Sequence, residues 1–539
     1  MRTLCLCLGL WFAAVASFAA QQAESGYRIS GVVIDAVTHT PVAHAQVAIS
    51  VGAEETKTTS GEDGRFVFQG VEPGKYPLFA SAQGYIREGY NQHGAFLTAI
   101  AVGPALDSEH VILRLHRQSV LTGKVTDEHG EPVRSAQVML FGNDKSNGRR
   151  GISIREQVQA NDLGEYRFAH LHAGKYYLAV QAQPWYAFNY MGESGQSNSS
   201  FVGTLWKPDP ALDVVYPITF YPGVKEADAA AELNLTSGDM QVANIQLQAV
   251  PAVHIRLTNS PAHAESGISI QANQKLFGSL IMPVSSISAQ VAPGEYEVAG
   301  LPPGDVTLVV NAGGNKEQHS RTIKANVVGS ETLDAAESGA LANVSGRVIL
   351  PAGEAISGHG RVMFFSDDGQ NASATLQKDG TFSFASLQEG TYKVMVNTSV
   401  NDEYVKSISA TGAKISAREI TVAGGDVQIS ITMGRGQGEI TGVAKLDDKP
   451  AAGMMVLLVP ASGQNLEEDS RLDQTDSDGT FTLPAISPGK YSLVAIEDGW
   501  DLEWTNAGIL KPYLGKAQSL QISANDKLKV TVEVQRKLP

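Results

Sequence analysis

The chain has 539 residues, 43% of them hydrophobic, with 41 basic and 56 acidic residues and a formal net charge of −15. This acidic balance argues against nucleic acid and anionic membrane surfaces as partners. The two cysteines, Cys5 and Cys7, both lie within the first twenty residues. Once those residues are removed, disulfides, thiol catalysis and cysteine-bound zinc are excluded.

Residues 1–20 are predicted to be a secretory signal peptide. Arg2 precedes an apolar run over 4–15, and the small residues of 16–20 offer a cleavage site. The run is too short to span a bilayer, and no later segment of about 18 apolar residues follows it. The sequence therefore predicts an exported protein, periplasmic or extracellular, with no membrane span after cleavage.

A pattern anchored on two glycines ten residues apart, here called the glycine pattern, recurs five times. The glycine pairs are Gly64 and Gly74, Gly164 and Gly174, Gly294 and Gly304, Gly380 and Gly390, and Gly479 and Gly489. An aromatic residue follows the first glycine by two positions, and bulky apolar residues follow by four and seven. A tyrosine stands twelve positions on, except in the third copy, which has Val306. Self-similarity of this kind indicates tandem copies of one domain.

The glycine pattern divides the chain into five predicted β-sandwich units. They are unit one (27–117), unit two (118–249), a diverged unit three (250–338), unit four (339–433) and unit five (434–539). Each holds about 100 residues, the commonest domain size, and can bury a core of its own.

Within a unit, the first predicted strand carries a glycine and ends at an aspartate, as in 31–35 and 123–127. Farther on, Asp63-Gly64 predicts a turn, and Phe66 and Phe68 alternate as in a strand with one buried face. Pro73-Gly74 suits a type II turn, so the glycine pattern predicts a hairpin.

A last strand is predicted to close most units. These strands cover 111–115, 242–247, 427–432 and 528–534. About seven short strands per unit, separated by Gly, Pro and Asp turns, are typical of an antiparallel sandwich. The fold class is therefore all-β, a tandem array of seven-stranded antiparallel β-sandwiches.

These residues resemble the carboxypeptidase regulatory-like family, a transthyretin-like (prealbumin-like) domain with a carbohydrate-binding-like fold. The resemblance covers units one, two, four and five. Unit three matches through Gly294, Tyr296, Leu301 and Gly304 only. The resemblance implies a seven-stranded sandwich without catalytic residues, and it implies no specific ligand.

Enzyme motifs are missing from the sequence. It has no His-x-x-Glu pair, no His-Glu-x-x-His helix and no Gly-x-Ser-x-Gly elbow. His170 and His172 fit a metal pair or a solvated loop, and Asp476, Asp478 and Gly479 fit a calcium loop or a hairpin turn. Without further ligands, the loop and the turn are favoured. We predict no catalytic residue, no metal and no cofactor.

Aromatic residues gather in the loops that follow the tyrosine-bearing strand of units two and five. The candidate ligand-binding residues are Trp185, Tyr186, Tyr190, Trp206, Tyr221, Trp500 and Trp504, the first five within an insertion over 184–222. Exposed rings of this kind stack against sugars or peptide side chains. The alternative is that the rings cap a sandwich or pack one unit on the next.

The sequence thus favours a non-enzymatic binding or scaffold protein of the bacterial cell envelope or exterior. A polysaccharide is the leading ligand, chiefly by fold resemblance, and a cell-surface protein is another possible partner. Two alternatives stay open: a structural spacer or protein interaction module, and an accessory subunit of a secreted peptidase.

Overall fold

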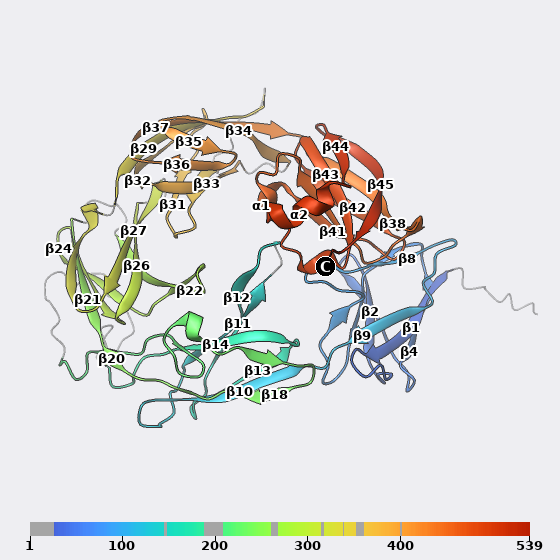
Figure 1. Cartoon of the computed structure of the whole chain (residues 1–539), viewed down its shortest axis with the longest axis horizontal. Coiled ribbons are helices and arrows are strands. Elements are labelled where there is room, and N and C mark those ends of the chain that lie inside the picture. The colour runs from blue at the N-terminus through green and yellow to red at the C-terminus, as the bar shows by residue number, and fades with distance from the viewer. Residues whose placement is uncertain are drawn as a thin grey trace, which may run out of the picture.

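The computed structural model describes residues 26–144, 148–187, 209–259, 268–313, 317–337, 339–351, 360–398 and 402–538. The predicted signal peptide, Tyr190 and Trp206 lie outside these residues. Figure 1 shows the units following one another around a ring, so that the first and the last are neighbours.

Unit one consists of two sheets and a separate strand pair. One sheet has the order β4 (Arg65–Val71), β1 (Tyr27–Asp35), β9 (Val111–Leu115). The other has the order β3 (Glu54–Thr59), β2 (Gln46–Val51), β6 (Leu78–Ser81), β7 (Glu88–Gly89), and the pair is β5 (Gly74–Tyr76) with β8 (Ile100–Val102).

Unit two repeats this plan with a longer second sheet. Its first sheet joins β13 (Glu165–Leu171), β10 (Ser119–Thr126), β18 (Met240–Val242) and β19 (Ile245–Gln246). The second joins β12 (Gly151–Gln159), β11 (Gln137–Asp144), β14 (Gly174–Gln181), β16 (Thr219–Phe220) and β17 (Leu233–Leu235). A short helix η1 (Ala227–Ala229) and the pair β15 (Val214–Val215) and β20 (Val250–Pro251) complete the unit and lead into unit three.

Units three and four share one continuous sheet. Its order is β23 (Leu280–Pro283), β22 (Ser269–Leu276), β26 (Gly304–Gly313), β27 (Glu317–Val327), β31 (Asn371–Thr375), β30 (Arg361–Phe365), β33 (Gly390–Asn397), β36 (Glu419–Val422), β35 (Ala413–Ser416). Unit three covers it with β24 (Ile287–Ala292), β25 (Glu295–Leu301), β21 (Val253–Thr258), β28 (Glu331–Asp334) and η2 (Ala335–Glu337). Unit four covers it with β32 (Thr381–Gln388), β29 (Leu341–Ile349), β37 (Gly425–Arg435) and β34 (Glu403–Thr411).

Unit five contains the two α-helices of the described residues. Its strands follow the order β39 (Lys449–Pro450), β38 (Gly438–Leu446), β45 (Lys527–Arg536), β43 (Gly489–Glu497), β40 (Met455–Pro460), β41 (Arg471–Gln474). β42 (Thr480–Ile486) pairs with β38, and β44 (Gln518–Ile522) pairs with β43. The α-helices are α1 (Leu466–Asp469) and α2 (Ala507–Leu514), and a short 3-10 helix, η3 (Gly499–Asp501), lies between them.

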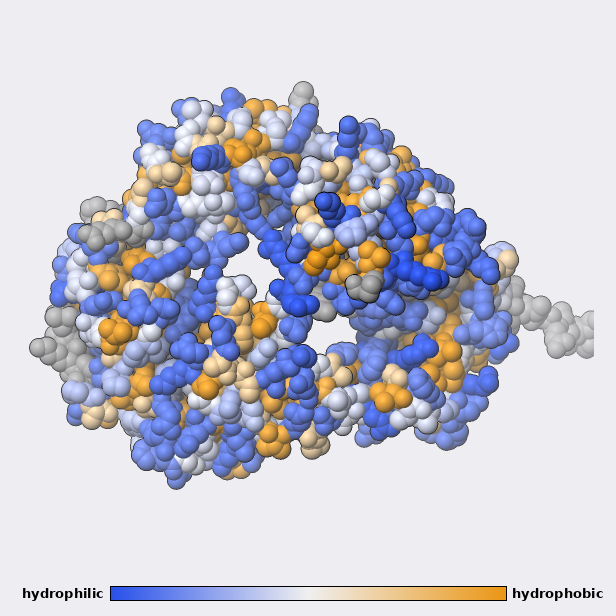
Figure 2. Space-filling model, in the orientation of Figure 1, coloured by the Kyte–Doolittle hydropathy of each residue, from blue (hydrophilic) through white to orange (hydrophobic). Residues whose placement is uncertain are grey.

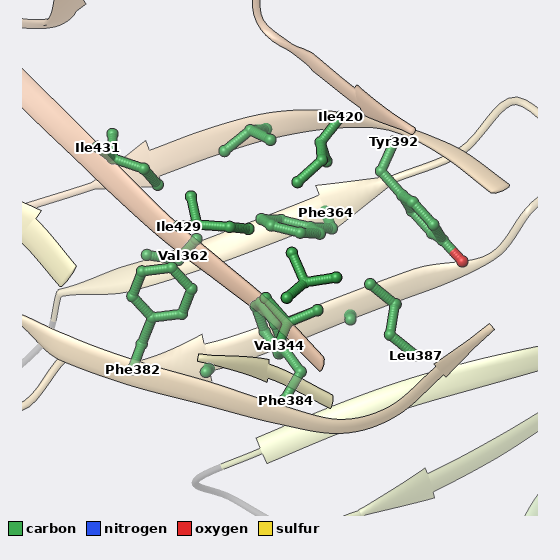
Figure 3. Packing of buried hydrophobic residues seen from close by; sticks show 14 of the residues in the cluster. Val344, Val362, Phe364, Phe382, Phe384, Leu387, Tyr392, Ile420, Ile429 and Ile431 are labelled. Carbon is green, nitrogen blue, oxygen red and sulfur yellow. The ribbon is translucent and has the colours of Figure 1, made fainter. Parts of the chain in front are cut away.

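The apolar residues of the glycine pattern form the cores. Each unit has its own cluster of buried apolar side chains, and every pattern residue at positions two, four, seven and twelve is at most 9% exposed. Figure 3 shows Phe382, Phe384, Leu387 and Tyr392 converging in unit four. The all-β sandwich fold is therefore confirmed, while the residue bounds of the units stay a prediction.

The predicted hairpin is wrong. β4 pairs with β1 in one sheet, whereas β5 pairs with β8 in another, and in the other units too the two strands pair with other strands and not with each other. Gly74 has none of the left-handed backbone that a type II turn requires at its third position. The chain crosses between sheets here because Phe66 and Tyr76 must reach one core from opposite sides.

The pairing is not antiparallel throughout. In every unit the last strand lies parallel to the first, as β9 does to β1 and β45 to β38. A parallel partner requires a crossover, and here the crossover is the opposite sheet of the sandwich. The first strand therefore lies between the glycine-pattern strand and the last strand.

Two backbone features of the repeat were missed by the sequence reasoning. Six positions after the first glycine, every unit has a residue with positive φ, at Gly70, His170, Gly300, Ser386 and Ala485. The register shifts at this point in all five units, as expected for a β-bulge. In addition, the pattern tyrosine donates a hydrogen bond to the carbonyl four residues before it in units one, two, four and five.

Neighbouring units are also packed against each other. The tip of the β22–β23 hairpin inserts Leu276 and Met282 among Met139, Phe141 and Phe220 of unit two. Between units three and four, Gln388 exchanges hydrogen bonds with the backbone N–H and carbonyl of Thr322 at 2.8 and 3.0 Å. Buried apolar and buried polar contacts thus both hold successive units together.

Candidate functional site

Trp185 and Tyr186 form an exposed aromatic corner on unit two. The Trp185 side chain is 84% exposed, and its ring lies perpendicular to that of Tyr186 with centroids 5.7 Å apart. The Tyr186 hydroxyl donates a hydrogen bond to Glu128, which also accepts one from Tyr216 at 3.1 Å. Glu128 therefore fixes the inner ring while the outer ring stays open to solvent.

The Glu128 carboxylate is held in its charged form. Burial opposes its ionisation, but hydrogen bonds from Tyr186, its own backbone and Tyr216 outweigh that effect and lower the pKa of Glu128. Burial and the carboxylate together raise the pKa of Tyr186 to about 12. The tyrosine therefore remains a donor at neutral pH, and the corner has a fixed geometry.

Tyr221 does not join this corner. Its ring packs, partly buried, against the core of unit two. Trp500 and Trp504 lie in unit five and make separate contacts with two other units.

Trp500 contacts unit one. Its ring stacks on His93 with centroids 4.9 Å apart and planes 6° from parallel, and Phe96 lies 5.5 Å away. Its indole N–H donates to the Gly453 carbonyl at 3.4 Å. This arrangement matches the alternative of a ring that packs one unit on another.

Trp504 contacts unit two. It is 7% exposed and packs with Leu510 and Tyr513 of α2. Gly148 lies so close to its indole that a β-carbon there would collide with the ring, and the Thr505 hydroxyl donates to the Gly148 carbonyl at 2.7 Å. The β11–β12 hairpin of unit two thus reaches across the ring to unit five, as Figure 1 shows.

A turn of unit five completes the contact with unit one. The Ser477 backbone N–H donates to the Ala99 carbonyl at 2.9 Å, and the Ala101 N–H donates to the Ser477 hydroxyl at 2.8 Å. The Lys75 ammonium lies 2.5 Å from an Asp476 oxygen. Residues almost 400 positions apart in the chain are therefore joined by backbone, side-chain and ionic contacts.

Buried amides extend the same interface. Gln474 donates to the Asn91 carbonyl at 2.6 Å and to the Thr98 hydroxyl at 2.8 Å, while His93 lies 3.0 Å from its amide oxygen. Gln474 and Thr98 are both almost completely buried. Buried polar groups of this kind are stable only when paired, so the contact fixes one orientation of the two units.

The two groups of residues that could fit a metal site have other structural roles. Asp476, Asp478 and Gly479 form the turn before β42, where the Gly479 N–H donates to the Asp476 carbonyl at 2.8 Å. His172 lies 3.7 Å from Glu88 of unit one, and His170 occupies the β-bulge. In the described part of the chain, no three His, Cys, Asp or Glu side chains gather closely enough to hold a metal ion.

The sequence reasoning missed the residues of unit one that receive unit five, chiefly His93, Thr98 and Ala99. They lie in a loop outside the repeat, so the glycine pattern carries no signal for them. The sequence reasoning also missed the helical cover of unit five, for which the uninterrupted apolar run 455–459 was a signal, because a strand buried on both faces reads this way. In the structure, Met455 and Leu457 face α2 while Val456 and Leu458 face the core.

Fold and contacts together define a tandem β-sandwich protein with packed units. Within it, residues 28–96 and 120–192 match the carboxypeptidase regulatory-like domain family. These matches lie in units one and two. No curated protein matches the chain.

Similar solved structures include several pilin subunits and the TIE protein of Bacillus anthracis. The TIE protein of Bacillus anthracis is 10% identical, with a TM-score of 0.16, over 91% of this chain and 65% of its own length. GBS52, the minor pilin of Streptococcus agalactiae, is 17% identical, with a TM-score of 0.20, over 36% and 96%. BcpA, the major pilin subunit of Bacillus cereus, is 13% identical, with a TM-score of 0.15, over 77% and 99%. Similarity at this level says nothing of function.

No helix among the described residues is long and apolar enough to cross a membrane.

Proposed function

We propose that the chain is a non-catalytic scaffold that holds its sandwich units in a closed ring and presents their outer loops to partners. The supporting observation is the contact between units one and five through Lys75, Ala99, Asp476 and Ser477. A flexible spacer needs no such contact, because its units are joined only in sequence. We further propose that the protein is exported and acts at the cell envelope or outside it.

A disulfide trap tests the closed ring. The carbonyl of Ala99 and the N–H of Ser477 share a backbone hydrogen bond, which places two such residues within the Cα distance that a disulfide spans, about 4.4–6.8 Å. Both native cysteines lie within residues 1–20, so a chain purified from residue 26 with Ala99→Cys and Ser477→Cys has one possible bridge.

We expect the oxidised double variant to form an intramolecular disulfide without denaturant, seen as faster migration on a non-reducing gel. The control pair is Glu54→Cys with Ser477→Cys, because Glu54 lies in β3, outside the contacts described between units one and five. Equal bridging in both pairs, or bridging in neither, contradicts the closed ring.

A second candidate function is carbohydrate binding at the Trp185 and Tyr186 corner. It is favoured by the exposure of Trp185 and by the bond that fixes Tyr186 to Glu128. An exposed ring beside a second ring that is held in place suits stacking on a pyranose. The contacts of Trp500 and Trp504 favour the scaffold, so we propose carbohydrate binding for this corner and not for those two rings.

Calorimetric titration of the wild type, Trp185→Phe and Trp185→Ala with soluble polysaccharides tests this second function. We expect the wild type to respond to at least one polysaccharide, Phe to keep part of the affinity, and Ala to lose it. Trp500→Phe is the control, because its ring faces unit one. A response that survives Trp185→Ala would rule out the corner as the site.

A further inference from the structure

A cavity of about 600 Å³ lies where units two, three and four meet. Its volume falls within the range of small-molecule sites, about 300–1,000 Å³. Figure 1 shows its main strands, β22, β26 and β27, on the inner side of the ring, with β21 and β24 outside them. The cavity is separate from the aromatic corner and from the contact between units one and five.

One face of the unit three sheet lines this cavity with polar side chains. Asn273, Thr307 and Lys324 stand in register across β22, β26 and β27, and Asp305 pairs with Asn326 in a second row. Residues on the opposite face of these strands, such as Leu308 and Ile323, lie in the core. Strand alternation therefore turns the hydrogen-bonding groups of three strands toward one space.

Phe277 and Ile281 give the cavity an apolar wall at the β22–β23 hairpin. Phe277 has a left-handed backbone, with φ of 49°, which is unfavourable for a bulky residue. Its ring packs on Phe141 and Tyr177 of unit two, with centroids 5.4 and 5.2 Å away. Because this packing holds the strained residue in place, the wall is fixed relative to unit two.

The cavity lining carries an excess of negative charge. It contains five carboxylates and two lysines, and one of the lysines, Lys324, is paired with Asp368 at 2.9 Å. Glu226, Asp228 and Asp367 have no ion-pair partner among the described residues. A concave surface of one charge sign concentrates ligands of the opposite sign.

Asn273 is the second sign of a ligand site. It is 7% exposed and lies on the cavity face of β22, yet its side-chain amide makes no hydrogen bond to any described residue. Asn273 does not belong to the completely buried unpaired side-chain groups of the described residues, so its amide is open to the cavity. A ligand that donates and accepts hydrogen bonds would pair this amide.

We propose that the cavity binds a small organic cation that carries ammonium groups, as polyamines and amino sugars do. The ammonium groups bind the carboxylates of Asp228 and Asp367, and one N–H or O–H of the ligand donates to the Asn273 amide oxygen. Thr307 and Lys324 bind further polar groups of the ligand. The site requires the packing of units two, three and four, and it does not depend on the closure between units one and five.

Calorimetric titration of the chain from residue 26 onward with spermidine, glucosamine trimer and maltotriose tests the proposal. We expect one molecule of at least one ammonium-bearing probe to bind per chain, with weaker binding at high salt. The uncharged maltotriose is expected to bind far more weakly. Binding of spermidine alone assigns a polyamine, and binding of the glucosamine trimer alone assigns an amino sugar.

Two double variants separate the cavity from the general acidity of the protein. Asp228→Asn with Asp367→Asn is expected to weaken binding about tenfold or more, because charge-assisted contacts are lost. Glu54→Gln with Glu131→Gln removes the same charge from exposed sites elsewhere and is expected to leave binding unchanged. Asn273→Ala is expected to weaken binding at constant charge.

The proposal is overturned if neither ammonium-bearing probe binds, if both double variants behave alike, or if maltotriose binds as tightly as the ammonium-bearing probe that binds best. Circular dichroism melts of each variant check that the sandwiches remain folded.

Discussion

A glycine in the first strand of unit five shows why the repeat needs this residue. A β-carbon on Gly442 would lie 2.6 Å from the Phe481 ring and 2.6 Å from the Val530 carbonyl oxygen. Phe481 is the aromatic residue of the glycine pattern, and Val530 lies on the parallel last strand. The glycine thus lets three strands approach each other above the core.

We expect Gly442→Ala to destabilise unit five by about 1–3 kcal/mol, the usual cost of overpacking a filled space. Gly151→Ala is the matched control, because a β-carbon there meets nothing within 4 Å. Hydrogen exchange read by mass spectrometry reports each unit separately. Equal exchange in the two variants would contradict the packing role.

His254 links units two and three through two carboxylates. Its ring nitrogens lie 3.1 Å from Asp213 and 2.9 Å from Glu297. Burial disfavours its charged form, but the hydrogen bonds to Glu297 and Asp213 and the charges of these two groups outweigh burial and raise the pKa of His254. The charged imidazolium therefore stabilises the junction.

This contribution depends on pH in a defined direction. Because the pKa is raised in the folded state, the stabilisation is complete below the unfolded value of about 6.5 and is lost as pH rises through the folded value. We expect His254→Gln to lower the free energy of unfolding by about 1–3 kcal/mol at about pH 6 and by less at about pH 9. Melting temperatures of both proteins across this range test it, and a cost that grows with pH would contradict it.

At the scale of elements, the β-bulge is the feature that unites all five units, including the diverged unit three. Gly70 and Gly300 suit its positive φ, whereas Ser386 and Ala485 adopt the same backbone at a cost. An L-residue with left-handed backbone destabilises the fold by roughly 1–2 kcal/mol relative to glycine. Glycine in turn loses about 0.5–1 kcal/mol because its unfolded chain has more conformational entropy.

Ala485→Gly is therefore expected to stabilise unit five by about 0.5–1 kcal/mol, since the Ala485 side chain is exposed and removing it sacrifices little packing. Gly70→Ala is the reverse test and should destabilise unit one. Hydrogen exchange of the β38–β42 and β1–β4 pairs measures both. Destabilisation by Ala485→Gly would show that the bulge is not strained.

The sequence predicted the core and the turns better than it predicted the pairing of strands. Phe66 and Phe68 identify a strand because alternation is local, and Gly64 adopts positive φ as a turn requires. The crossing at Gly74 was mistaken for a hairpin, since one strand–turn–strand pattern fits both. Only nonlocal contacts decide which sheet the second strand joins.

The candidate site was less predictable for a similar reason. Exposed and buried aromatic residues look alike in sequence, so Trp185 and Trp500 were both predicted to bind a ligand. In the structure Trp185 is exposed, whereas Trp500 stacks on His93 of unit one. The cavity residues Asn273 and Thr307 read as ordinary polar positions of alternating strands. They gather only because β22 and β26 pair and three units meet.

At the scale of the whole molecule, unit five joins the ring. The short helix α1 presents Glu467 to Arg149 of unit two at 3.0 Å and to Lys393 of unit four at 3.5 Å, and it presents Asp469 to Arg418 at 2.6 Å. Figure 2 shows openings through the molecule on either side of the central contact between units two and five. The protein is thus a closed ring of units in which the β11–β12 hairpin of unit two reaches across to unit five.

Small-angle X-ray scattering of the chain from residue 26 onward tests the closed ring most directly. Units of about 100 residues have a radius of gyration of about 13 Å, so five of them in a ring give a radius of gyration of roughly 30 Å, and five in a straight rod give roughly 50 Å. The closed ring predicts a value near 30 Å that does not change with protein concentration. A value near 50 Å would contradict it.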